Sequence, residues 1–181
     1  MRGKTKNYFL QFRAQAMAEF ALVLPILLMV VFGLLEVGRA IFIYSSAINA
    51  SRDAARYASV YGVNANDNLQ FQDCVEIRNI ARRTGFLLPL EDDDIVIAYD
   101  TGPDPDTGIV PASFDTCDDV DGVDEAVGLA CGDRVVVTIT VEFDPIVPLL
   151  VPLDARTIVA SSARTYFGVI KLDEDNPPTC N

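Results

Sequence analysis

Residues 20–35 read FALVLPILLMVVFGLL, a run of sixteen positions without a charged side chain. At 1.5 Å per residue, a helix of this length covers about 24 Å. Residues 37–44 extend the apolar run except at Arg39, whose long aliphatic stem can carry its charge toward an interface. Because about 20 apolar residues suffice to cross a bilayer, the stretch predicts a transmembrane helix in contact with lipid.

The residues before this run indicate that the helix is retained and that its N-terminus is cytoplasmic. A secretory signal peptide carries small residues after its apolar core, at the cleavage site. Here Ala14, Ala16 and Ala18 precede the core, so any processing is expected at the cytoplasmic end. Four basic residues also precede the first acidic one, and basic flanks stay in the cytoplasm. We therefore expect a single-pass protein of the cytoplasmic membrane whose C-terminal domain is extracytoplasmic.

Small residues recur at helical spacing beyond the membrane segment. Residues 45–61 contain neither Pro nor Gly and are rich in alanine, so one helix is expected from about Met17 to Tyr61. The stripe on its outer half consists of Ala47, Ser51, Ala54, Ala55 and Ala58. Small side chains allow backbones to approach closely. The stripe can therefore pack under the protein's own sheet or against neighbouring copies, and the sequence leaves both alternatives open.

The composition limits the partners of the remaining chain. The 181 residues include 14 basic and 26 acidic ones, which gives a net charge of -12. After the basic start the chain is acidic throughout and has no basic stripe. Such a surface does not attract a phosphate backbone, so nucleic acid is excluded as a partner.

The residue types that support most enzyme chemistry are missing. The sequence has no histidine, no glycine-rich phosphate loop and no nucleophile elbow, so we expect no catalytic residues, no cofactor and no enzyme activity. Acidic residues cluster at 92–94 and 118–125, but neither cluster follows the calcium-loop pattern of an EF-hand. Solvated acidic loops, and not metal sites, are the expectation for both.

All four cysteines lie beyond the apolar segment, where an oxidising compartment would let them pair. They are Cys74, Cys117, Cys131 and Cys180. Two disulfides are expected, and three connectivities are open. A bridge from Cys117 to Cys131 would close the long segment 100–132, rich in Asp, Gly, Pro and Thr, while a bridge from Cys74 to Cys180 would tie down the C-terminus.

The C-terminal two thirds predict an α+β domain. Residues 69–84 have the apolar spacing of a short amphipathic helix, capped from Asp67 or Asn68. Strands are expected at 95–99, 134–143 and 156–167; the second of these contains VVVTITVEF, which alternates near its end. Helices followed by strands indicate an α+β domain with a small antiparallel sheet, and the paired cysteines would staple it.

An apolar segment with three prolines separates the last two expected strands. Residues 144–154 read DPIVPLLVPLD. Proline excludes a central strand or an ordinary helix here. The segment is either a buried crossing loop or an exposed apolar contact for a partner or the membrane surface.

Two charged groups lie within or beside the apolar helix. Glu36 and Arg39 are three residues apart, hence on one helical face, and are expected to form an ion pair near the outer interface. Glu19 directly precedes the apolar run, where an ionisable group is costly unless it is interfacial or paired.

The surroundings of Glu19 resemble the processing site of type IVb prepilins and pseudopilins. The resemblance implies that a prepilin peptidase cuts between Ala14 and Gln15, so that Glu19 and Phe20 become the fifth and sixth mature residues. The family usually has Gly where this chain has Ala14, which keeps a small residue before the cut. Cleavage would create an α-amino group close to Glu19, and a carboxylate near lipid costs less beside a positive partner.

The longer string QAMAEFALVLPILLMVVFGLLEVGRAIFIYSSAINASRDAARYAS resembles the TadE-like family, minor pilins or pseudopilins of the Tad (tight adherence, Flp pilus) secretion apparatus. The resemblance covers roughly the first third of the chain. It implies a prepilin peptidase, other pilins and an inner-membrane assembly platform as partners, and a role in assembling, priming or decorating a thin adhesive filament.

These features predict three regions: a basic cytoplasmic leader at 1–14 that is cleaved, a long helix at 15–62 that is transmembrane in its first half, and an extracytoplasmic α+β domain at 63–181. The leading hypothesis for function is a non-enzymatic minor pilin. The alternatives are a permanently anchored extracytoplasmic binding module and the main filament subunit itself.

Overall fold

The computed structural model describes residues 6–60, 62–64, 67–117, 128–146, 156–168, 170–171 and 179–180, with side chains described at 15–60 and in the later ranges up to 168. The chain divides into two compact units. Unit 1 comprises residues 1–41 and 144–155, and unit 2 comprises residues 42–143 and 156–181.

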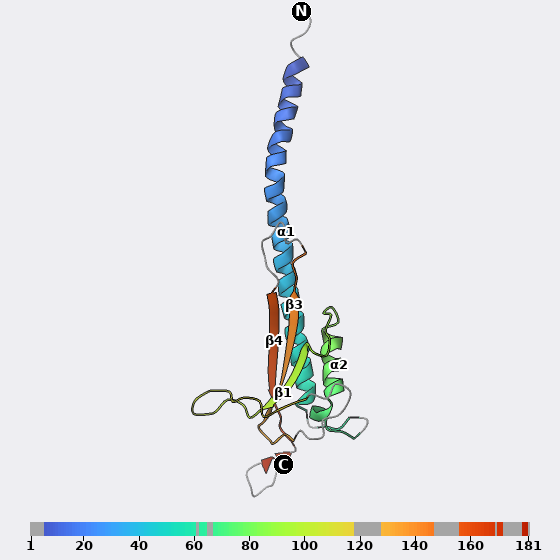
Figure 1. Ribbon diagram of the computed structural model, residues 1–181, viewed down its shortest axis with the longest axis vertical. Helices are drawn as coiled ribbons and strands as arrows, with labels where there is room; N and C mark the ends of the chain where they lie inside the picture. Colours follow the sequence, from blue (N-terminus) through green and yellow to red (C-terminus); the bar gives the residue numbers. More distant parts are fainter. Residues whose placement is uncertain are drawn as a thin grey trace, which may run out of the picture. The chain divides into compact units, whose positions relative to one another are not determined.

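Helix α1 (Lys6–Ala58) is the long helix that the sequence predicts (Figure 1). It begins earlier than the expected Met17, because no Pro or Gly interrupts the chain between Lys6 and that residue. Pro25 lies inside α1 without ending it. From Gln15 onward α1 is long and apolar enough to cross a membrane, with a mean hydropathy of 2.7 over its most apolar window, of which only 6% is buried. A core helix of a water-soluble protein would be mostly buried instead.

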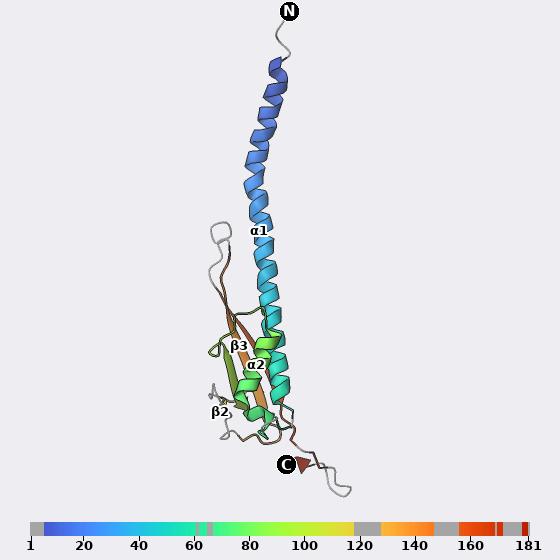
Figure 2. The same cartoon turned by 90° about the vertical axis from the view of Figure 1, so that its right-hand side faces the viewer.

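Unit 2 has the predicted α+β architecture (Figures 1 and 2). Its antiparallel sheet has the order β2-β1-β3-β4. The strands are β1 (Ile95–Asp100), β2 (Asp115–Thr116), β3 (Arg134–Phe143) and β4 (Arg156–Thr165). A separate pair consists of β5 (Ile170–Lys171) and β6 (Thr179–Cys180).

One face of the four-stranded sheet forms the core with the helices. Alternate residues of β3 are buried, from Val135 to Val141, as the alternating sequence predicts. They share a single buried cluster with Ile97 of β1 and with residues of α1 and α2. Figure 2 shows the helices on the same side of the sheet.

The helix expected at residues 69–84 is divided in two. A 3-10 turn, η1 (Gln70–Gln72), precedes α2 (Cys74–Thr84). The cap is Asp73, whose side chain accepts a hydrogen bond from the N–H of Glu76 at 3.0 Å, and not the expected Asp67 or Asn68. A carboxylate at this position accepts a hydrogen bond from a free N–H of the first turn, and its negative charge is stabilised by the positive end of the helix dipole.

Cys74 and Cys117 form a disulfide, so the suggested bridges from Cys117 to Cys131 and from Cys74 to Cys180 are wrong. Cys74 opens α2, whereas Cys117 directly follows β2, and pairing of β2 with β1 brings their Cα atoms to 5.8 Å. This separation suits a disulfide. Cys131 is also disulfide-bonded, and the side chain of Cys180 lies outside the described residues.

A bidentate ion pair joins the end of β1 to the start of β3. Nε and Nη2 of Arg134 donate to the two carboxylate oxygens of Asp100 at 2.6 and 2.8 Å, and the N–H of Gly102 donates to Asp100 at 2.8 Å. The hydrogen bonds from Arg134 lower the pKa of Asp100, with a further contribution from Gly102. The pair is largely shielded from solvent, so it is expected to stabilise unit 2.

We expect Asp100→Asn to reduce the loss of stability that acid causes. A carboxyl group whose pKa is lowered on folding stabilises the protein above its unfolded pKa, about 4, and this contribution disappears as the pH falls through the folded pKa. Urea unfolding between neutral pH and pH of about 3 measures the effect. Asp106→Asn, at an exposed loop position, is the control. Equal acid slopes for the wild type and Asp100→Asn would contradict the prediction.

Candidate functional site

The residues of the expected processing site lie on consecutive turns of α1. The side-chain amide of Gln15 donates to the carboxylate of Glu19 at 3.1 Å, one helical turn away. Both side chains are exposed, as is that of Phe20. Ala14 also lies within α1, although its side chain is outside the described part. The polar side chains of Gln15 and Glu19 and the apolar side chain of Phe20 are therefore all accessible on the surface of α1.

The stripe of small residues is fully buried inside unit 2. Its members Ala47, Ser51, Ala54, Ala55 and Ala58 have no exposed surface and share the core cluster with α2 and the sheet. The Ser51 hydroxyl donates to the carbonyl oxygen of Ile48 at 3.0 Å, so its polar group is satisfied. Of the two alternatives for this stripe, the structure therefore realises packing within the protein's own domain.

The earlier turns of α1 carry an almost continuous apolar surface, which we call the apolar belt. Its exposed large side chains are Met17, Phe20, Leu22, Val23, Ile26, Leu27, Leu28, Met29, Val30, Val31, Leu34, Leu35, Val37, Ile41, Phe42 and Tyr44. Burying one large apolar side chain gains about 1.5–3 kcal/mol relative to leaving it in water. A surface of this size requires lipid or other apolar helices around it.

Glu36 and Arg39 form the predicted ion pair, with 3.4 Å between Glu36 Oε2 and Arg39 Nε. The pair also holds the chain that leaves β3. The backbone N–H of Ile146 donates to Glu36 Oε1 at 2.7 Å, and Nη2 of Arg39 donates to the carbonyl oxygen of Asp144. Glu36 is only 3% exposed. We call this arrangement of Glu36, Arg39, Asp144 and Ile146 the clasp.

The backbone partners of the clasp could not be anticipated from the sequence. Ile146 is 110 positions from Glu36 and contributes its backbone N–H, which no side-chain pattern marks. A hollow of about 350 Å³ lies beside the clasp. It is lined by Phe32, Leu35 and Ile146 and by the charged residues Glu36 and Arg39, so most of its wall is apolar and its charged groups are already paired.

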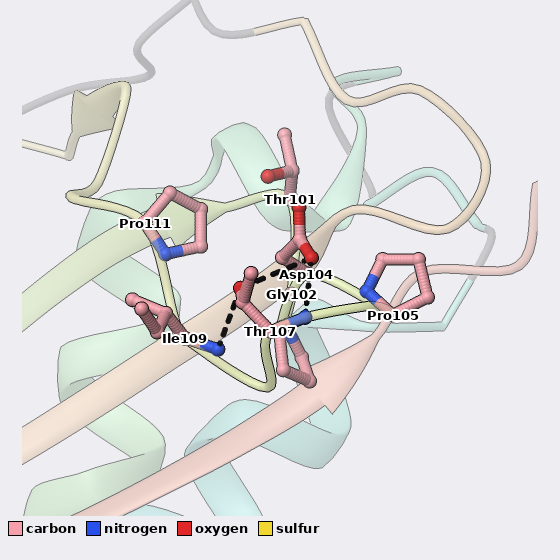
Figure 3. A pocket seen from close by; sticks show the side chains of 8 residues that line it. Thr101, Gly102, Asp104, Pro105, Thr107, Ile109 and Pro111 are labelled. Atoms are coloured by element: carbon pink, nitrogen blue, oxygen red, sulfur yellow. Dashed lines mark hydrogen bonds between the residues drawn. The ribbon is translucent and has the colours of Figure 1, made fainter.

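A second hollow, of about 490 Å³, lies in the loop after β1 (Figure 3). Asp104 is the acidic residue in its lining. Its carboxylate accepts hydrogen bonds from the N–H and hydroxyl of Thr107 and from the N–H of Asp106, at 2.8 to 3.0 Å. These hydrogen bonds lower the pKa of Asp104, and the bonds from Thr107 contribute most. The carboxylate therefore organises the loop itself.

The acidic cluster at 92–94 is also used structurally. Asp92 pairs with Arg82 of α2, and the carboxylate of Asp94 accepts a hydrogen bond from the N–H of Glu91 at 2.9 Å. Among the described residues, no group of three acidic or sulfur-containing side chains is placed to hold a metal ion. The acidic stretch at 118–125 lies outside those residues.

Comparisons with known proteins single out the first third of the chain. Neither a curated protein nor a solved structure matches. Residues 14–56 match the family model TadE, described as TadE-like protein. The matched segment contains Glu19, the apolar belt, Glu36 with Arg39 and most of the buried stripe. This match confirms the resemblance seen in the sequence and suggests a Tad pilus-associated protein.

Proposed function

We propose that this protein is a minor pilin or pseudopilin that takes part in assembling or decorating a Tad/Flp-type adhesive pilus. The observation that carries the proposal is the exposed apolar belt of α1 within the segment that matches the TadE-like family. The proposed role is non-enzymatic, because packing of α1 against lipid or against other pilins supplies the interaction. The inner-membrane assembly platform is the proposed site where lipid is exchanged for pilin helices.

The two parts of α1 suit this exchange. The apolar belt has no partner within the described residues that covers it, whereas the small-residue stripe is already buried in unit 2. Transfer of the belt from lipid to a helix bundle replaces one apolar environment by another. The free energy of transfer therefore depends on side-chain packing and polar contacts between the helices. The core of unit 2 can remain intact throughout, because its stripe is not part of the belt.

The geometry at Glu19 supports processing by a prepilin peptidase. The family match begins at Ala14, the last residue of the leader, so the basic residues before it lie outside the matched segment. After a cut between Ala14 and Gln15, the new α-ammonium group would belong to Gln15, whose side chain is already one turn from Glu19. A positive group at this distance lowers the cost of the carboxylate near lipid. The ammonium of a neighbouring subunit could take the same place during assembly.

The first test is the N-terminal residue of the protein purified from its native envelope, identified by intact mass and terminal peptide sequencing. We expect it to be Gln15. Ala14→Gly, which introduces the family's usual residue, should be processed, whereas Ala14→Arg should retain residues 1–14. A wild-type protein that begins at Met1 would contradict the proposal and favour a permanently anchored extracytoplasmic binding module.

The main filament subunit is the other alternative. That role would require a repeating contact between copies, for which the small-residue stripe was the candidate. The stripe is fully buried in its own domain, so it does not support this alternative. The amount of this chain relative to other pilins in sheared surface material distinguishes a minor from a main subunit.

A further inference from the structure

The clasp gives the chain a second apolar group beside α1. The backbone of Ile146 is held by Glu36, yet its side chain is 73% exposed. Both residues belong to unit 1, so their contact does not depend on how the two units are placed. Ile146 lines a hollow together with Leu35 of the apolar belt, so it extends a large exposed apolar surface. A contiguous surface of this kind indicates a partner of apolar chemistry.

The position of Glu36 along α1 sets the depth of this group. A hydrocarbon core of about 30 Å is crossed by about 20 helical residues. Counted from Phe20, that length ends near Arg39, so Glu36 lies within one helical turn of the outer boundary. Exposed Leu35 and Val37 flank Glu36, so the apolar belt reaches the level of the clasp. Ile146 is therefore at the level of the outer leaflet.

The polar groups of the clasp are arranged as a lipid environment requires. An irregular backbone near hydrocarbon must have its polar groups satisfied. The N–H of Ile146 and the carbonyl of Asp144 are both bonded within the clasp, and Pro145, between them, has no N–H. The carboxylate of Glu36 is buried against Arg39, so the two charges compensate each other. Arg39 stays partly exposed, and its guanidinium can reach lipid phosphates.

We propose that the clasp holds Ile146 in the outer leaflet of the bilayer, so that the chain contacts lipid through this residue as well as through α1. The hollow beside the clasp is lined by three apolar side chains and by the paired Glu36 and Arg39, which suits an acyl chain whose phosphate headgroup Arg39 contacts. The sequence that follows Ile146, VPLLVPL at 147–153, is also uncharged. The inference requires α1 to span a membrane, as the proposed function does, but it does not require peptidase processing or a filament.

The absence of tryptophan from the chain makes this depth measurable. Ile146→Trp introduces a single tryptophan, and the full-length protein is reconstituted in phosphatidylcholine vesicles that carry bromine near either end of the acyl chain. We expect blue-shifted emission and several-fold stronger quenching by bromine near the headgroup than by bromine near the methyl end. Leu28→Trp, in the middle of the belt, should show the opposite preference, and Val159→Trp, exposed on β4, should not be quenched.

The role of the clasp is tested by adding Glu36→Leu to the Ile146→Trp chain. Loss of the carboxylate should reduce the quenching of the introduced tryptophan several-fold, while Leu28→Trp with Glu36→Leu stays as strongly quenched as Leu28→Trp alone. Unchanged quenching in the Ile146→Trp chain would overturn the role of the clasp. Red-shifted, unquenched emission from Ile146→Trp would place the site in water, and blue-shifted, unquenched emission would mean that protein covers it; either result overturns the proposal. Failure of N-terminal processing would leave all these outcomes unaffected.

Discussion

Replacing Cys74 and Cys117 by alanine is expected to lower the free energy of unfolding of unit 2 by about 4 kcal/mol. The disulfide joins residues 43 positions apart and so restricts a long loop of the unfolded chain. Both cysteines are fully buried, so their removal also reduces core packing. Because domains of this size are stable by only about 5–15 kcal/mol, the loss would be a large fraction of the total.

The measurement is urea unfolding of the full-length protein in detergent, monitored by the circular dichroism signal of the sheet. A reductant added to the double variant separates this bridge from the one that involves Cys131. A loss of less than about 1 kcal/mol would contradict the prediction. It would mean that other links between α2 and the strands suffice, such as the hydrogen bond of 2.7 Å from Arg78 to the carbonyl of Cys117.

Ala55→Leu is expected to destabilise unit 2 by about 1–3 kcal/mol or more, because it places three additional carbons in a filled core. Ala55 has no exposed surface and belongs to the buried cluster that α1 shares with α2 and the sheet. Alanine and leucine have similar helix propensities, so packing and not helix formation produces the difference.

Arg52→Leu is the matched control for Ala55→Leu. It introduces the same side chain into the same helix one turn earlier, at an exposed position. Its effect on the free energy of unfolding should stay within about 0.5 kcal/mol. If both variants unfold at the same urea concentration, the contact between α1 and the sheet must be loose enough to accept leucine, which would contradict the packing described above.

Strong periodic patterns predicted the main elements because local chemistry determines them. The alternation around Val135 to Val141 predicted β3 with its observed bounds, and the uncharged run after Glu19 predicted the part of α1 that is apolar enough to cross a membrane. The short strand β2 was not predicted, since two residues carry no pattern and pair only because β1 lies beside them. The same applies to η1, which displaced the start of the second helix to Cys74.

The parts of the site that depend on distant residues could not be derived from the sequence. Small residues at Ala47 and Ala54 fit a sheet or another copy equally well, so only their observed burial distinguishes the alternatives. The disulfide partner of Cys74 depends on the pairing of β2 with β1. Glu36 and Arg39 were identified as a pair, but their contacts with the backbone at residues 144–146 follow from the path of the chain after β3.

The order of synthesis gives the small residues of α1 a second consequence. Every strand that covers the stripe is made after the helix, and roughly 85 residues separate Ala58 from the end of β3 at Phe143. At about 5–20 residues per second, the ribosome needs on the order of 4–17 seconds to add them. During this delay the stripe is uncovered, but alanine and serine expose much less apolar surface than leucine would. The side chains that allow close packing in the finished domain therefore also limit premature association of the nascent chain.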